Sequence, residues 1–132
     1  MHDAALTDTD PFDLPEWLGT SDVVWRADAG LSTGHLVEGR LSAAEDPALE
    51  IVCDLLAVDE AYPAPVVDDA TRLRVHQAWR HGQVVVGERG SRLALAVPGT
   101  GFGPELVLEA LGRLARAVGA RPERYAALLR LG

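Results

Sequence analysis

The sequence has no lysine and no asparagine, and all twelve of its basic residues are arginines. The absence of lysine excludes Schiff-base chemistry and the phosphate-binding loop whose lysine contacts a nucleotide. Cysteine occurs once, at Cys53, so no internal disulfide forms, and no cluster of cysteine and histidine has the spacing of a structural zinc site. The sequence therefore predicts neither a metal nor a cofactor.

Long apolar runs are also missing, because no stretch approaches the roughly 20 residues that a membrane-spanning helix needs. The first ten residues, MHDAALTDTD, lack the cationic start and apolar centre of a secretory signal. We therefore expect a cytoplasmic protein that does not contact membranes. The length of 132 residues fits one globular domain. We expect residues 1–10 to form a disordered acidic tail and residues 11–132 to form a single domain.

The charges are divided unevenly between the two halves of the chain. Residues 1–69 hold 16 of the 20 acidic residues and two arginines, a net charge of -14. Residues 70–132 hold ten arginines and four acidic residues, a net charge of +6. Because each half is short for a separate domain, we expect the two halves to complement each other within one fold.

The hydrophobic pattern predicts an α+β domain with an antiparallel sheet of about five strands flanked by helices. The expected order is one turn, three strands, a helix, two strands and two helices. A strand that is apolar on much of both faces, as at residues 49–58, belongs near the centre of the sheet. The expected elements are a turn ending at Gly19, strands at 23–28, 35–42 and 49–58, a helix at 69–80, strands at 84–88 and 92–97, and helices at 104–119 and from 122 onward.

This order of elements, with the small size and the acidity, resembles that of class I type III secretion chaperones and of the YbjN-like proteins that share their fold. The resemblance covers about residues 12 to 130 and rests on no sequence motif. It implies a small, acidic, cytoplasmic protein, usually a dimer, that holds a segment of another protein and performs no chemistry.

Two apolar features are candidates for binding a partner. One is a stripe at helical spacing in the helix from residue 104, and the other is an aromatic segment near the N-terminus. The leading hypothesis is a non-enzymatic protein-binding module, similar to a chaperone or adaptor, whose partner is another protein chain or a second copy. The candidate partner-binding residues are Phe12, Trp17, Val107, Leu111, Leu114 and Val118.

An acidic loop at residues 59–69 supports an alternative, a small-molecule-binding protein or an enzyme. Carboxylates beside a tyrosine are groups that serve acid–base chemistry. The residues of this alternative ligand site are Asp59, Glu60, Tyr62 and His35. The competing interpretation is that the loop is solvated and that Asp68 or Asp69 begins the following helix.

A third hypothesis is an arginine-rich adaptor for nucleic acid, with a basic surface in the C-terminal region. Such a surface needs arginines to contact phosphates and aromatic residues to stack on bases. Only Tyr125 lies near those arginines, and the pI of about 4.8 argues against nucleic acid. The arginines in question are Arg113, Arg116, Arg121, Arg124 and Arg130.

Overall fold

The structure is a computed structural model that describes residues 6–31, 35–60 and 66–129. Its helices are α1 (Trp17–Thr20), α2 (Asp69–Arg80) and α3 (Pro104–Ala117), with short 3-10 turns η1 (Pro11–Asp13) and η2 (Pro122–Arg124). Its strands are β1 (Leu6–Asp8), β2 (Val23–Ala27), β3 (Leu36–Val37), β4 (Gly39–Ala43), β5 (Glu50–Ala57), β6 (Val85–Arg89), β7 (Arg92–Val97) and β8 (Tyr125–Leu128).

The strands form one mixed sheet in the order β1-β6-β7-β5-β4-β2-β8, with β3 also paired to β5. The pairs β5/β7 and β2/β8 are parallel. The predicted α+β mixture is confirmed, but the predicted antiparallel sheet of about five strands is wrong. The chain leaves β5 through α2 and returns with β7, rather than β6, beside β5. This crossover makes the central pair parallel.

Two of the strands lie where the sequence predicts none. Residues 6–8, within the expected disordered tail, pair with β6 at the edge of the sheet. At the other end of the chain, η2 lasts only three residues before the backbone becomes extended as β8. The Tyr125 hydroxyl donates a hydrogen bond to the Leu18 carbonyl at 2.5 Å, which fixes the start of β8 against α1. The predicted helix from residue 122 is therefore a turn followed by a strand.

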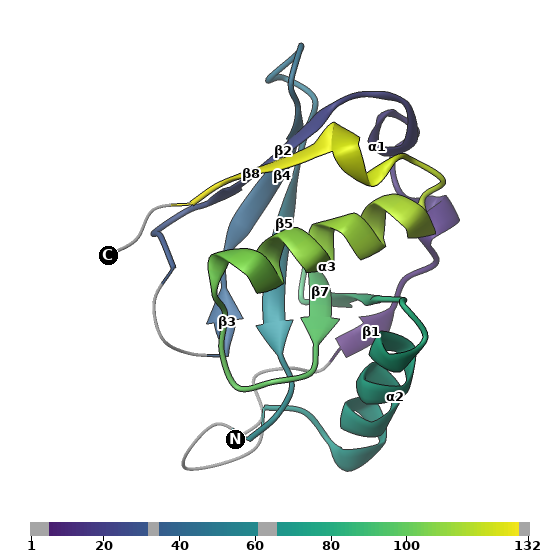
Figure 1. The fold of residues 1–132 in the computed structure, drawn as a ribbon, viewed down its shortest axis with the longest axis vertical. Helices are drawn as coiled ribbons and strands as arrows, with labels where there is room; N and C mark the ends of the chain where they lie inside the picture. Colours follow the sequence, from purple (N-terminus) through teal and green to yellow (C-terminus); the bar gives the residue numbers. More distant parts are fainter. Residues whose placement is uncertain (1–5, 32–34, 61–65, 130–132) are drawn as a thin grey trace.

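The larger core lies between the sheet and α3, which crosses one face of the sheet (Figure 1). Trp25 of β2 is fully buried there, and its indole Nε1 donates to the Cys53 carbonyl at 2.8 Å. The indole lies directly on Gly39, where an added Cβ would be 2.4 Å from a ring carbon. Glycine at position 39 is thus a condition for burying this indole.

A second, smaller core lies on the opposite face of β5, because successive strand residues point to opposite sides. Leu56 and Val58 pack there with Val75 of α2. Figure 1 shows α2 beside β1, away from α3. Asp54 lies on the same side of β5 as Leu56, and its side chain is fully buried. Within the described residues, no helix combines the length and apolar character needed to cross a membrane.

Candidate functional site

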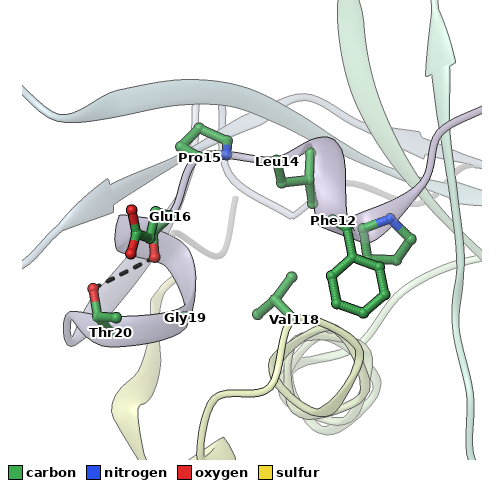
Figure 2. Close-up of a pocket in the computed structure, with 8 residues that line it drawn as sticks. Phe12, Leu14, Pro15, Glu16, Gly19, Thr20 and Val118 are labelled. Atoms are coloured by element: carbon green, nitrogen blue, oxygen red, sulfur yellow. Dashed lines mark hydrogen bonds between the residues drawn. The ribbon is translucent and has the colours of Figure 1, made fainter.

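A pocket lies between the N-terminal segment and the C-terminal end of α3. Its volume is about 410 Å³. In Figure 2, Val118 projects from the end of α3 toward the gap between Phe12 and Glu16. We call this feature the Phe12 pocket, and it is lined by Pro11, Phe12, Leu14, Pro15, Glu16, Gly19, Thr20 and Val118.

Local hydrogen bonds fix the conformation of the segment that carries Phe12. The Asp10 carboxylate accepts the Phe12 amide at 3.0 Å, and Pro11 occupies the first position of η1. These are the two features that begin a helical turn, a capping carboxylate and a proline whose φ is already set. The backbone that supports the ring is therefore held in place, whereas the ring itself is in solvent.

Phe12 is 88% exposed, more than any other large hydrophobic residue in the described part of the chain. The pocket surface beside Phe12 depends on a close approach between α1 and the turn after α3. A Cβ at Gly19 would lie 3.0 Å from the Val118 carbonyl oxygen. The small residue at position 19 therefore lets the two segments meet and leaves the hollow beside Phe12.

The six residues predicted to bind a partner fall into three groups. Val107, Leu111 and Leu114 are buried in the core beneath α3, so they have no surface to offer a partner in the folded chain. Trp17, like Val118, is partly buried against the same core, but it does not line the pocket. Phe12 and Val118 meet at the Phe12 pocket, and they are the two that remain in a binding proposal.

Exposed charges of opposite sign lie in the two segments that form the pocket. Asp13 and Glu16 belong to the N-terminal segment, whereas Arg116 and Arg121 stand before and after Val118 in the chain. Within residues 6–31, 35–60 and 66–129, none of these four side chains forms an ion pair. Of these four residues, only Glu16 lines the pocket.

The alternative ligand site is placed only in part. Asp59 accepts the Gly99 amide at 3.0 Å, and its other oxygen lies 2.8 Å from Nε2 of His76. Glu60 is exposed, and His35 is half-buried before β3. Tyr62 lies outside the described residues. No group of three metal ligands occurs in the portion of the chain that is described.

Sequence reasoning did not find His76 as the partner of Asp59. The two residues lie 17 positions apart, on opposite sides of the loop that joins β5 to α2. An aspartate that orients a histidine is an arrangement found in general bases. Here the same pair also connects the end of β5 to α2, and Gly99 joins them to the end of β7. The contacts therefore hold three segments together. The other imidazole nitrogen of His76, Nδ1, does not contact Asp59.

A second cluster that the sequence did not reveal surrounds Asp54. Arg92 donates to both carboxylate oxygens, from Nε at 2.8 Å and from Nη2 at 2.7 Å, and Arg89 Nη2 lies 3.3 Å away. The hydrogen bond to Asp54 is the main cause of the raised pKa of Arg92. Asp28 and Glu38 also lie within 4.0 Å of these guanidinium groups. The cluster pairs a fully buried carboxylate with two guanidinium groups and joins β5, β6 and β7.

Cys53 has no nucleophilic role in this arrangement. Its side chain is fully buried in the larger core. Burial raises the pKa of the thiol, and the neighbouring Asp54 carboxylate adds to that effect. A thiol that stays protonated is a poor nucleophile. Cys53 is therefore a small buried hydrophobic residue.

Several ion pairs join the acidic first half to the basic second half. Arg74 contacts Asp8, Arg92 contacts Asp54, and Arg124 Nε lies 4.0 Å from Asp22. The two halves thus complement each other inside the fold, as expected from the charge distribution. Comparisons with protein-family models, with curated proteins and with solved structures give no match.

Proposed function

We propose that this chain is a protein-binding module that uses the Phe12 pocket as its binding surface. The observation that carries the proposal is an aromatic ring 88% exposed on a backbone held by a capping hydrogen bond. Burying a phenylalanine side chain stabilises a protein by roughly 1.5 to 3 kcal/mol. A chain that holds Phe12 outside its own core leaves that free energy for association with a partner.

The pocket beside the ring supports the same conclusion. Its volume of about 410 Å³ lies within the range of about 300 to 1,000 Å³ that is typical of binding sites. Aromatic residues beside well-packed hollows are the positions that dominate the energy of protein interfaces. Leu14, Pro15 and Val118 would contact an inserted apolar side chain, and Glu16 would face its polar surroundings.

The direct test is a selection of random displayed peptides on the immobilised chain, followed by affinity measurement with fluorescently labelled peptides. We expect apolar or aromatic peptides whose dissociation constant rises about 30-fold in Phe12→Ala, the size of a hot-spot loss. Leu73→Ala is the matched control, because Leu73 is also exposed, at 60%, but lies on α2. Equal binding to wild type and Phe12→Ala would contradict the proposal, as would a selection that enriches no peptide from a chain that sediments as a monomer.

The Asp59–His76 pair favours a second candidate function, recognition of a small molecule at the acidic loop. Asp59 contacts Nε2 of His76, so its carboxylate does not occupy Nδ1 of the same ring. A panel of divalent metals, nucleotides and metabolites would be scanned for an increase in melting temperature, because ligands of the native state stabilise it. A shift that disappears in His76→Ala supports this candidate, and a panel without any shift opposes it.

A further inference from the structure

We propose that this chain binds a small sugar phosphate in a second pocket, at the C-terminal end of α2. The inference is independent of the Phe12 pocket, because the two pockets share no lining residue. The second pocket has a volume of about 480 Å³, within the range of about 300 to 1,000 Å³ that is typical of small-molecule sites. We call it the Arg80 pocket, and it is lined by Arg74, Gln77, Ala78, Arg80, His81 and Gln83.

The first argument is the sign of the charges in the Arg80 pocket. Two arginines and a histidine line it, and no carboxylate of the described residues does. This composition is opposite to that of the whole chain, in which 20 acidic residues outnumber 12 arginines. Another hollow, of about 200 Å³, contains Arg26 and Arg40, but Asp28 and Glu50 line it as well. An anion in the Arg80 pocket therefore meets hydrogen-bond donors without a carboxylate beside them.

The second argument is that these cations have few contacts inside the chain. Among residues 6–31, 35–60 and 66–129, the side chains of Arg80 and His81 form no ion pair and no hydrogen bond. Arg74 contacts Asp8 through Nη1, at 2.5 and 2.7 Å, and this contact positions its guanidinium. Arginine binds phosphate oxygens through two parallel hydrogen bonds. Arg80 has its whole guanidinium to offer in this way.

The third argument concerns the end of the helix itself. Free carbonyl groups give a helix C-terminus a partial negative charge, which attracts cations and repels anions. Here the Trp79 and Gln83 carbonyls accept hydrogen bonds from the Arg113 guanidinium. The Ala78 carbonyl accepts the backbone amides of His81 and Gln83. Because other groups satisfy these carbonyls, the cations of the Arg80 pocket are not needed to cap α2 and remain free to bind a ligand.

The remaining polar side chains indicate what the phosphate is attached to. Gln77 and Gln83 carry amides, and neither side chain forms a hydrogen bond within the described part of the chain. An amide both donates and accepts, and so does a sugar hydroxyl group. Ala78 contributes the only apolar side chain of the lining, so an apolar ligand finds little to contact. We therefore assign the cations to a phosphate group and the amides to the hydroxyl groups of the attached sugar.

Binding of ribose 5-phosphate to the full chain tests this inference. Isothermal titration calorimetry measures the dissociation constant, and heteronuclear NMR locates the residues that respond. Ribose and inorganic phosphate are the matched ligands, because each carries one half of the compound. We expect ribose 5-phosphate to bind more tightly than either, and to shift the amide resonances of residues 77–83.

Variants on α2 separate the Arg80 pocket from a general attraction between charges. Arg80→Gln should raise the dissociation constant about ten-fold or more, the size of a lost hydrogen bond to a charged group. His81→Gln should also weaken binding, because it removes a second cation from the lining. Arg72→Gln is the matched control, since Arg72 lies on the same helix but contacts Asp69, at 3.9 Å, and does not line the pocket. It should bind as wild type does.

The contrary outcomes are equally specific. The inference is overturned if ribose 5-phosphate does not bind, or if it shifts only resonances outside the Arg80 pocket. Equal weakening in Arg80→Gln and Arg72→Gln also overturns it, because net charge would then explain the attraction. Inorganic phosphate that binds as tightly as ribose 5-phosphate removes the role of the amides and overturns the assignment to a sugar phosphate.

Two further ligand and variant comparisons complete the test. A single-stranded oligonucleotide that displaces ribose 5-phosphate at a lower concentration overturns the inference in favour of a nucleic-acid backbone. Phe12→Ala should bind ribose 5-phosphate as wild type does, because Phe12 lies in the other pocket. Weaker binding in that variant would contradict the independence of the two pockets and with it the inference.

Discussion

Arg92 holds both carboxylate oxygens of Asp54, a side chain with no exposed surface, at 2.7 and 2.8 Å. An arginine fork on a carboxylate is the strongest common pairing of charged side chains in proteins. The pair lies in the middle of the sheet, where β5 and β7 run parallel. The stability of the central strands therefore depends on a buried charge being paired.

Removing one partner should be far more damaging than replacing both. We expect Asp54→Ala to lower the free energy of unfolding by about 3 to 5 kcal/mol, because two guanidinium groups lose their buried counter-charge. The double variant Asp54→Leu/Arg92→Met should lose less, since only Arg89 is then left without its contact to Asp54, and Glu38 lies 4.0 Å from that guanidinium. Urea unfolding followed by circular dichroism measures both. Equal losses in the single and the double variant would show that packing, and not charge pairing, sets the cost.

Gly39 should tolerate no side chain. In Gly39→Ala the new Cβ would be 2.4 Å from the Trp25 ring and 2.6 Å from the Arg26 carbonyl oxygen. We expect a loss of about 1 to 3 kcal/mol or more, which is typical of an overpacked core. Gly112→Ala is the control, because the nearest atom to its Cβ would be 3.8 Å away in the interior of α3. That change should stabilise the chain by up to about 1 kcal/mol. Urea midpoints of the two variants should move in opposite directions.

Alkaline pH should unfold the chain through two buried groups. Burial raises the pKa values of both the Tyr125 phenol and the Cys53 thiol above their ordinary values of 10.0 and 9.0. The unfolded chain therefore loses these protons first, so stability is complete below pH 9 and falls as pH rises. Above pH 10 each group contributes a loss of about 1.4 kcal/mol per pH unit.

Tyr125→Phe provides the check on that pH dependence. This variant has no hydroxyl to donate to the Leu18 carbonyl, so it should be less stable than wild type at neutral pH. Its stability should fall less steeply above pH 10, because one of the two titrating groups is gone. Urea unfolding at half-unit intervals from pH 8 to 11.5 gives both slopes. An unchanged slope would place the alkaline sensitivity at other groups.

Alanine variants of Phe12 and Leu111 should show that the first side chain does not contribute to folding stability and that the second does. Phe12→Ala should leave the free energy of unfolding of the monomer within about 0.5 kcal/mol of wild type, because the ring is 88% exposed. Leu111→Ala should cost about 2 to 5 kcal/mol, because that side chain is buried in the core. Urea unfolding at a concentration low enough to keep the chain monomeric compares them. A large loss of stability in Phe12→Ala would assign the ring to the core.

Local features of the fold were predictable because they depend on neighbouring residues. The Asp68 carboxylate accepts the Thr71 amide at 2.8 Å, and this is the capping contact that the sequence suggests at the start of α2. Helix α3 begins at Pro104 as expected. The apolar character of both faces of β5 correctly placed that strand in the interior of the sheet.

The order of the strands was not predictable, because hydrophobic spacing says which face is buried and not which strand lies alongside. The strands β6 and β7 were both predicted, but nothing in their residues specifies that β7 would take the place beside β5. Residues 125–128 carry no helix-breaking residue, and their conversion to a strand depends on the open edge of β2. In both cases the pairing with a neighbouring strand, and not the local sequence preference, determined the structure.

The candidate site was predictable in part for the same reason. The aromatic segment stood out because Phe12 lies among acids and prolines, but its neighbour Val118 comes from the other end of the chain. Asp54 was a visible signal, a carboxylate in the middle of an apolar strand that needs a partner. Which arginine supplies it depends on the pairing of β5 with β7, 38 residues further along.

The β2/β8 ladder aligns Val23 with Tyr125, two positions 102 residues apart in the chain. Closing a loop of that size costs conformational entropy before any contact can compensate for it. Proteins rich in such distant contacts reach the native state slowly, because ordering of the chain must precede the gain in free energy. While this chain folds, β2 therefore spends a long interval as an open strand edge. In that interval the chain is most prone to aggregate. Electrostatic attraction between its acidic N-terminal half and its basic C-terminal half shortens the time that β2 and β8 need to meet.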